Sequence, residues 1–336
     1  MEEYILGIET SCDDTAVAIF SSTRGLVVHK KATQLEHDIY GGVVPEIASR
    51  SHMKTLLPLF NVVMNEVGIE LGNLSAVGVT HGPGLTGSLL VGLSFAKALA
   101  YSSSKPLIGI HHIEGHILAN AIGEKMNFPS LSLVVSGGHT QLIYVKDIGR
   151  YEVVGSTRDD AAGEAFDKIA KLLGLPFPGG PAIEKVAKKG KGDAFDFPRA
   201  LRGSGRLDFS FSGLKTAVRL KVESFDEITP ELQADIAASA QEAIVDILAE
   251  KSQKAIESFK VKHFYLAGGV AANGRLREEI LKRIGSLGVD VHWPELKFCT
   301  DNAAMIACSA YYHFLYGHTH DLTLNTFPRG DIESWR

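Results

Sequence analysis

The sequence of 336 residues is poor in cysteine. It has three cysteines, Cys12, Cys299 and Cys308, and no two of them form a CxxC pair. A disulfide framework needs paired cysteines, and a zinc site built on cysteine needs closely spaced ones. We therefore exclude both and expect a protein of a reducing compartment, the cytoplasm.

Long hydrophobic runs are also missing. No segment approaches the roughly 20 apolar residues of a membrane-spanning helix, and the acidic start of the chain lacks the basic and apolar regions of a signal peptide. The hydrophobic content of 45% still allows a full core, and the length allows two domains. We expect a globular protein with no membrane partner.

Excess charge is small, because the formal net charge is −5. An acidic chain does not by itself attract phosphate backbones, so any contact with nucleic acid has to be local or shared with a partner. The best local candidate is the basic stretch from Arg199 to Lys221, in which Asp208 is the only acid. From this stretch alone, an ordinary solvated surface is the favoured interpretation.

Two common phosphate-binding motifs are absent. The sequence has no GxxxxGK[ST], and no GxGxxG opens a helix after the first strand; Gly82-Pro83-Gly84 lacks the third glycine. The chemistry of P-loop proteins and of Rossmann dinucleotide domains is therefore not supported. Phosphate binding, if the chain has it, requires another kind of turn.

A weak internal repeat is present. Residues 5–19 and 131–145 each read as an apolar strand, a small polar turn and a second strand. Each segment is followed by a third strand-like run, at 25–29 and 151–154. The matching Ser and Thr positions favour duplication of one structural plan.

Strand and helix signals alternate along the rest of the chain, as in α/β architectures. The further elements that we expect are strands at 76–80 and 262–266 and helices at 89–101, 230–259 and 272–284. The boundary between two lobes is expected near 124–129. This gives an N-terminal lobe of residues 1–125 and a C-terminal lobe of residues 126–336.

Three polar turns follow predicted strands, at Thr10–Asp14, Ser136–His139 and Gly268-Gly269. Backbone N–H groups and hydroxyls in such turns can bind phosphate oxygens, and a Gly-Gly before a helix offers the positive helix N-terminus. One glycine turn is weak evidence, since turns in any fold need glycine. The repeated hairpin turns are what predict a nucleotide site.

The strongest metal signal is the pair His112 and His116. On a helix, residues four apart share one face and can bind a single ion. Glu114 lies about 200° around the helix from His112 and should point away from the metal. The arrangement thus differs from the HExxH motif of metalloproteases, which disfavours a protease. Histidines that bind no metal are the alternative.

A third ligand is needed, and carboxylates commonly complete such sites. Asp301 is the candidate. It lies where a helix of small and apolar residues begins, so it is also a candidate N-cap or first-turn acid. From the local sequence, the cap interpretation is favoured.

An acidic segment, 159–168, combines carboxylates with small residues. Asp167 is a candidate acceptor for ribose hydroxyls, whereas favourable charges at a helix start explain Asp159 and Asp160. The rigid turn at 178–181 follows, and Glu184 one helical turn later either binds hydroxyls or is plain surface.

Together these residues resemble one family, the tRNA threonylcarbamoyladenosine synthases called TsaD, Gcp or YgjD in bacteria. The resemblance covers nearly the whole chain in the family's order. The stretches that carry it are Gly7–Asp13, Gly41–Glu46, His112–His116, Val135–Thr140, Asp160–Lys168, Asp208–Lys215 and Cys299–Asn302.

The resemblance implies an α/β structure of the actin-like ATPase (ASKHA) fold, made of two duplicated RNase H-like lobes with the active site in a central cleft. It implies that His112, His116 and Asp301 bind one divalent ion, iron or zinc. The residues that it implies for nucleotide and substrate binding are Val134, Val135, Ser136, Gly137, Gly138, Asp167, Gly180, Glu184 and Asn273.

The resemblance also implies an activity. Family members transfer the threonylcarbamoyl group of threonylcarbamoyl-AMP to N6 of the adenosine just 3′ of the anticodon, in tRNAs reading codons that begin with A. A separate synthase makes the adenylate, and bacterial members work with an inactive paralogue, TsaB, and an ATPase, TsaE. We therefore expect tRNA, an adenine nucleotide (threonylcarbamoyl-AMP, ATP or AMP) and these three proteins as partners.

Two other classes of function remain open, because one fold hosts many activities. The first is a small-molecule kinase, although a magnesium-dependent kinase does not need the His112, His116 and Asp301 set. The second is a non-catalytic scaffold in which nucleotide binding only switches conformation and partner binding.

Overall fold

The structure is a computed structural model that describes residues 2–34, 37 and 42–333. Gly41 of the stretch Gly41–Glu46 lies outside these residues. The chain forms two compact units. The first comprises Met1–Met126, Asp147–Arg150 and Pro294–Arg336, and the second Asn127–Lys146 and Tyr151–Trp293.

The last segment of the chain differs from the expected division into lobes. Residues 126–336 were expected to form one C-terminal lobe, whereas Pro294–Arg336 belongs to the first unit. The reason is helix α9 (Ala303–Leu315), which packs on strands of the first unit. Its small and apolar residues complete a core that the N-terminal part of the chain leaves open.

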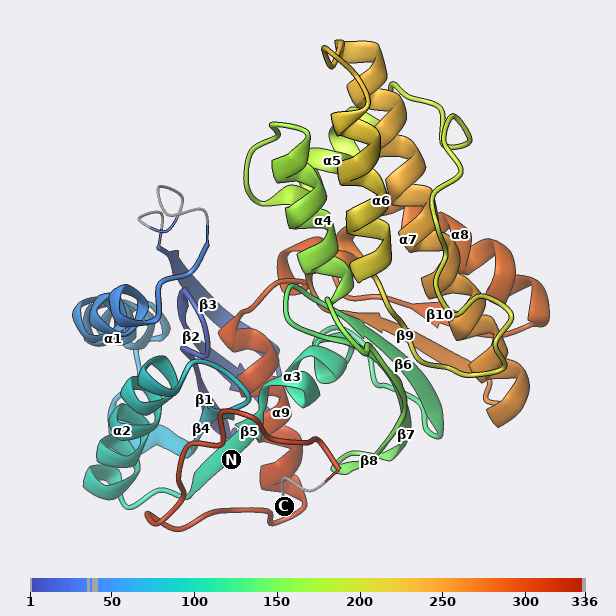
Figure 1. The fold of residues 1–336 in the computed structure, drawn as a ribbon. Helices are drawn as coiled ribbons and strands as arrows, with labels where there is room; N and C mark the ends of the chain where they lie inside the picture. The colour runs from blue at the N-terminus through green and yellow to red at the C-terminus, as the bar shows by residue number, and fades with distance from the viewer. Residues whose placement is uncertain (1, 35–36, 38–41, 334–336) are drawn as a thin grey trace. The chain divides into compact units, whose positions relative to one another are not determined.

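The first unit contains one five-stranded sheet of order β3-β2-β1-β4-β5 (Figure 1). Its strands are β1 (Tyr4–Glu9), β2 (Asp14–Ser21), β3 (Gly25–Thr33), β4 (Leu74–Gly82) and β5 (Leu107–His111). Strand β1 pairs antiparallel with β2 and parallel with β4, and β4 pairs parallel with β5. The expected hairpin within residues 5–19 and the strand at 76–80 are confirmed.

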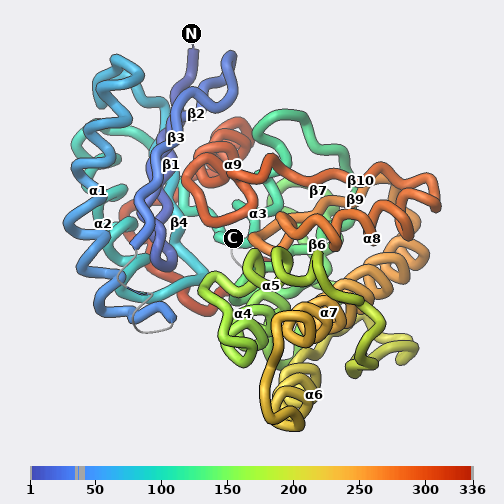
Figure 2. Tube along the Cα trace, turned by 90° about the horizontal axis from the view of Figure 1, so that it is seen from above, coloured from blue at the N-terminus to red at the C-terminus, as the bar shows by residue number. Residues whose placement is uncertain are grey.

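Helices cover both faces of this sheet. On one face lie α1 (Pro45–Val67) and α2 (Thr86–Ser103), and on the other lie α9 and the short α3 (His112–Leu118) (Figures 1 and 2). Two separate hydrophobic clusters result, because the central strands are buried on both sides. The helix expected at 89–101 is confirmed.

The second unit contains another five-stranded sheet, of order β10-β9-β6-β7-β8. Its strands are β6 (Ser130–Val135), β7 (Thr140–Asp147), β8 (Arg150–Ser156), β9 (His263–Ala267) and β10 (Asp290–His292). Strand β6 pairs antiparallel with β7 and parallel with β9, and β9 pairs parallel with β10. The predicted second hairpin and the strand at 262–266 are confirmed.

The helices of the second unit pack against one another around the longest of them, α7. They are α4 (Ala162–Leu172), α5 (Gly179–Ala187), α6 (Ser212–Glu223), α7 (Pro230–Phe259) and α8 (Gly274–Ile284). Helix α7 covers the range expected for it, 230–259. It begins at Pro230 because the side chain of Thr229 caps its first turn and accepts a hydrogen bond from the amide of Leu232. Helix α8 begins slightly later than expected.

The two sheets have the same topology. Read from the hairpin edge, each contains three consecutive strands in reversed order followed by two parallel ones, β3-β2-β1-β4-β5 and β8-β7-β6-β9-β10. This match confirms the duplication inferred from the repeat of residues 5–19 at 131–145. None of the helices in the described part of the chain combines the length and the hydrophobicity that a membrane span requires.

Candidate metal centre and nucleotide loops

Helix α3 presents two histidines side by side. It follows β5 directly, and the side chain of His111 caps it by accepting a hydrogen bond from the amide of Ile113 at 3.3 Å. The rings of His112 and His116 have centroids 4.7 Å apart, and both residues are buried. The spacing of four residues therefore places both imidazoles on one face, as predicted.

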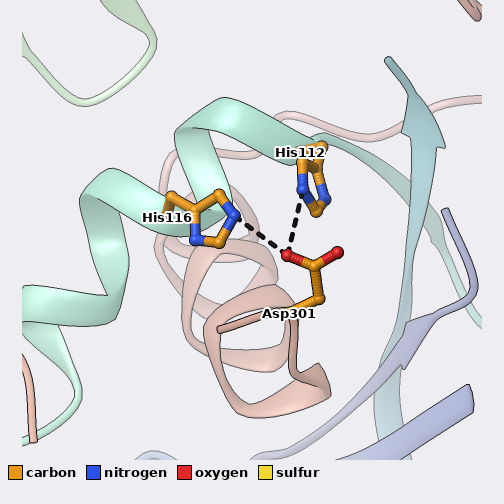
Figure 3. A group of neighbouring side chains, drawn as sticks. All are labelled: His112, His116 and Asp301. Carbon is orange, nitrogen blue, oxygen red and sulfur yellow. Dashed lines mark ion pairs between the residues drawn. The ribbon is translucent and has the colours of Figure 1, made fainter. Parts of the chain in front are cut away.

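Asp301 lies opposite these histidines, in the loop before α9. Its Oδ1 is 3.2 Å from Nε2 of His116 and 3.5 Å from Nε2 of His112 (Figure 3). The cap interpretation of Asp301 is wrong, because Asn302 caps α9 by accepting a hydrogen bond from the amide of Met305 at 2.8 Å. The side chain of Asn302 therefore caps the helix, and the carboxylate of Asp301 faces the two histidines.

The three side chains fit a single metal ion. Their ligand atoms all lie within 4.8 Å of one another. A tetrahedral ion with bonds of about 2.0–2.2 Å holds its ligand atoms roughly 3.3 Å apart, close to the two distances found. His116 is buried, and its Nε2 faces Oδ1 of Asp301. A tetrahedral ion held by these three side chains would keep one coordination position open, as in catalytic sites.

Without a cation, the centre is a buried ion pair. Burial by itself lowers the pKa of His112, but the carboxylates of Asp301 and Glu9 outweigh it and raise that pKa to about 10. Burial likewise raises the pKa of Asp301, but His112 and His116 hold it well below its usual range. A metal ion that binds here must displace the proton of His112.

Glu114 points away from this centre, as the helical geometry predicts. Its Oε2 lies 2.9 Å from Nε2 of His313 on α9, and both residues are buried. A different carboxylate, Glu9 at the end of β1, lies 3.2 Å from Nδ1 of His112. No role was predicted for Glu9, although it lies within the stretch Gly7–Asp13; its local signal is an acid at the end of an otherwise apolar strand.

In the second unit, the turn between β6 and β7 packs against the start of α4. The amide of Gly163 donates to the carbonyl of Ser136 at 3.2 Å. Gly137 and Gly138 are exposed, and a Cβ added at either would meet nothing within 4 Å. The turn is thus fixed by its contact with α4 and has open space beside its two glycines.

Val134 and Val135 differ from the glycines that follow them. Their side chains are fully buried in β6, so only their backbone is available for contact with a ligand. A Cβ at Gly268 would lie 2.4 Å from the carbonyl oxygen of Val135. The third predicted turn therefore lies directly beside the second.

Asp167 contacts Gly179, the residue before Gly180, through the packing of α4 on α5. The amide of Gly179 donates to Oδ1 of Asp167 at 2.7 Å. Burial raises the pKa of Asp167, and this hydrogen bond opposes the rise only in part. Gly180, the next residue, has open space at its Cβ position.

Glu184 and Asn273 meet at the start of α8. Oε1 of Glu184 accepts a hydrogen bond from the amide of Gly274 at 3.1 Å. Asn273 caps the helix by accepting from the amide of Leu276 at 2.9 Å, and it donates to Oε1 of Gln241 at 3.0 Å. Both side chains thus fix the N-terminus of α8.

Three of the six basic residues between Arg199 and Lys221 pair with acids from other segments. Arg199 and Arg202 both pair with Asp246 of α7, and Arg202 also pairs with Glu250. Lys215 lies 3.7 Å from Asp160. These partners reduce the positive potential that the sequence suggested.

Two units of identical topology, one with a His-His-Asp centre and one with open glycine turns, define a protein of the actin-like ATPase fold class. HypF from T. kodakarensis is similar, with a TM-score of 0.63 at 16% identity, over 96% of this chain and 50% of that chain. The activator of 2-hydroxyisocaproyl-CoA dehydratase from Clostridium difficile, solved with bound ADPNP, has a TM-score of 0.51 at 11% identity, over 95% and 98%. These likenesses confirm the fold alone.

Sequence comparison resolves the family. The profile of TsaD, described as tRNA N6-adenosine threonylcarbamoyltransferase, matches residues 25–308. The tRNA N6-adenosine threonylcarbamoyltransferase of Carboxydothermus hydrogenoformans is 51% identical over 332 residues, which cover 98% of this chain and 97% of that protein. The chain belongs to the TsaD family of tRNA N6-adenosine threonylcarbamoyltransferases. It is therefore a transferase that modifies tRNA, and the kinase and scaffold alternatives are not favoured.

Proposed function

We propose that the chain takes the threonylcarbamoyl group from threonylcarbamoyl-AMP and transfers it to N6 of the adenosine just 3′ of the anticodon, in tRNAs reading codons that begin with A. The exocyclic amine of adenosine attacks the carbamoyl carbon, the bond from that carbon to the phosphate oxygen breaks, and AMP leaves while the amine loses a proton. The observation that carries this proposal is the convergence of His112, His116 and Asp301 in a member of this family.

His112, His116 and Asp301 are proposed to hold one divalent ion, iron or zinc. Bound there, the ion supplies a Lewis acid for the carbonyl oxygen of the threonylcarbamoyl group. His112, His116 and Asp301 would orient the threonylcarbamoyl group by fixing the position of the ion. Burial of both histidines limits access of water, which would otherwise hydrolyse the adenylate.

The second unit is proposed to bind the adenylate. Support comes from the open space at Gly137, Gly138 and Gly180 beside backbone amides that can donate to phosphate oxygens. Asp167 is proposed to accept a hydrogen bond from a ribose hydroxyl. Glu184 and Asn273 contribute indirectly, since they fix the N-terminus of α8.

The wider assembly is proposed from the family. A TsaB-like paralogue, a TsaE-like ATPase and a synthase that supplies threonylcarbamoyl-AMP complete the reaction. Binding of tRNA is proposed to use the stretch after Arg199 together with surface from these partners, because three of the six basic residues of that stretch are paired with acids of the chain itself. The free thiols of Cys12, Cys299 and Cys308 support a cytoplasmic site of action.

The test is transfer in vitro, with the three partner proteins, ATP, threonine, bicarbonate and unmodified tRNA, and with modified adenosine measured by nucleoside mass spectrometry. We expect product from the wild type and at least a 100-fold lower rate for Asp301→Ala and for Gly138→Val. The first loses a metal ligand, and the second fills the space proposed for the nucleotide without a clash in the free protein. The control is Asp321→Ala, which removes an exposed carboxylate from the unit that contains Asp301 and should keep the wild-type rate.

Absence of product with active partners and metal-loaded wild type would refute the proposal. A normal rate for Asp301→Ala would remove the metal centre from it, and a normal rate for Gly138→Val would remove the β6–β7 turn from nucleotide binding.

A further inference from the structure

Glu9 is a fully buried carboxylate beside the candidate metal centre. It is the last residue of β1, at the edge where the loops of the parallel strands begin. Among the ion pairs of the described residues, its partner is His112, and no lysine or arginine pairs with it. A buried carboxylate without such a partner is costly, so its retention in the core needs a reason.

Three groups fix the orientation of this carboxylate. The amide of Ser11 donates to Oε1 at 2.5 Å, and the hydroxyl of Thr80 on β4 donates to Oε2 at 2.6 Å. The third is Nδ1 of His112, at 3.2 Å from Oε2. The carboxylate is thus held by two neighbouring segments and has one oxygen directed at the histidine ring.

The opposite nitrogen of that ring faces the centre. Nε2 of His112 lies 3.5 Å from Oδ1 of Asp301. A metal-binding histidine needs a lone pair on the coordinating nitrogen, and a hydrogen bond from its other nitrogen to a carboxylate fixes that tautomer and the ring orientation. Ser11 Oγ, 3.1 Å from the same Nδ1, is the other possible acceptor.

We propose that Glu9 is a positioning residue of the metal centre, which accepts a hydrogen bond from Nδ1 of His112 and thereby directs Nε2 at the ion. This inference rests on the proposed function, since it requires that His112 bind a metal. It assigns the buried charge a role: the carboxylate of Glu9 offsets the positive charge that a divalent ion brings into the core.

The test measures metal affinity directly. Zn²⁺ binding is followed by competition with a chromophoric chelator, and the geometry of the centre by the visible absorption of the Co²⁺-substituted protein. We expect Glu9→Gln to lower zinc affinity 10–100-fold, the range found for such partners of metal ligands, and to alter the Co²⁺ spectrum.

Two variants act as controls. Glu114→Gln neutralises a second fully buried carboxylate, which lies on α3 and contacts His313 rather than a proposed metal ligand. This variant should change zinc affinity less than 3-fold. Ser11→Ala removes the competing acceptor and should also leave the affinity within 3-fold.

A further variant tests Glu9 indirectly. Thr80→Val removes one of the groups that hold Glu9 and should weaken zinc binding severalfold.

Wild-type zinc affinity and an unchanged Co²⁺ spectrum in Glu9→Gln would overturn the inference, and so would an equal loss in Glu114→Gln. If Glu9→Gln does not fold, Thr80→Val decides, and an affinity within 2-fold of wild type counts against the role of Glu9. Failure of the wild type to bind metal, or normal binding by His116→Ala, would instead refute the proposed metal centre itself.

Discussion

Neighbouring histidines in the first unit show how strongly the surroundings set the protonation of one residue type. Burial lowers the pKa of His111 to about 3, whereas Asp301 and Glu9 outweigh burial at the adjacent His112 and raise its pKa to about 10. His29 resembles His111, because burial and then Lys31 lower its pKa to about 4. Position relative to carboxylates, rather than residue type, decides which histidine carries charge.

His29 gives a prediction for pH. Its folded pKa of about 4 lies below the value of 6.5 for an exposed histidine, so the unfolded chain takes up the proton first. The free energy of unfolding should therefore fall as pH decreases from about 6.5 to about 4, by on the order of 2 kcal/mol at pH 5 from this residue. His29→Gln should lose less stability between pH 7.5 and pH 5 than the wild type, measured by urea unfolding. An identical pH dependence in both proteins would contradict this expectation.

At the scale of elements, α9 is seated on the first sheet through glycines. A Cβ at Gly7 of β1 would lie 2.4 Å from the backbone nitrogen of Ala307, and one at Gly78 of β4 would lie 2.4 Å from the Cβ of Ala310. The helix therefore touches the strands closely. This packing also sets the position of Asp301, which lies two residues before the first residue of α9.

Gly7→Ala should destabilise the protein by about 3 kcal/mol, the upper end of the usual cost of overpacking, because backbone atoms cannot move aside easily. It should also weaken zinc binding, since displacement of α9 moves Asp301. The matched control is Gly123→Ala, where the new methyl group meets nothing within 4 Å. Urea unfolding and zinc competition measure the two effects, and equal stability of the two variants would show that α9 does not depend on this contact.

At the scale of the whole molecule, the two ends of the chain combine in one unit. The apolar residues of β1, β4 and β5 pack in a single cluster with Met305, Ile306 and Ala310 of α9. The second unit, by contrast, is contained within residues 127–293. The two units therefore depend differently on an intact chain.

Expressed alone, residues 127–293 should fold cooperatively, whereas residues 1–126 should not, because one face of their sheet lacks α9. Circular dichroism and thermal unfolding distinguish the outcomes. Addition of residues 294–336 as a separate chain should restore structure to residues 1–126. Cooperative unfolding of residues 1–126 by themselves would show that α9 is dispensable for that core.

Local pattern in the sequence was enough to predict the duplication and part of the elements, whereas α1, α6, β5 and β10 were not predicted. The strand-turn-strand repeat and the range of α7 follow from hydrophobic periodicity and turn residues, which act over short separations. The spacing of His112 and His116 likewise depends only on the geometry of a single helix. The family resemblance extended these local signals to fold and activity.

The family resemblance implied Asp301 as a ligand of the candidate metal centre, but only the tertiary structure brings Asp301 and Glu9 to His112. The local sequence favoured a cap for Asp301 and assigned nothing to Glu9, because each meets His112 only when β1, α3 and the loop before α9 pack together. Local sequence likewise did not predict that residues 294–336 belong to the first unit. Contacts between distant segments depend on which apolar faces pack, and no local pattern specifies that choice.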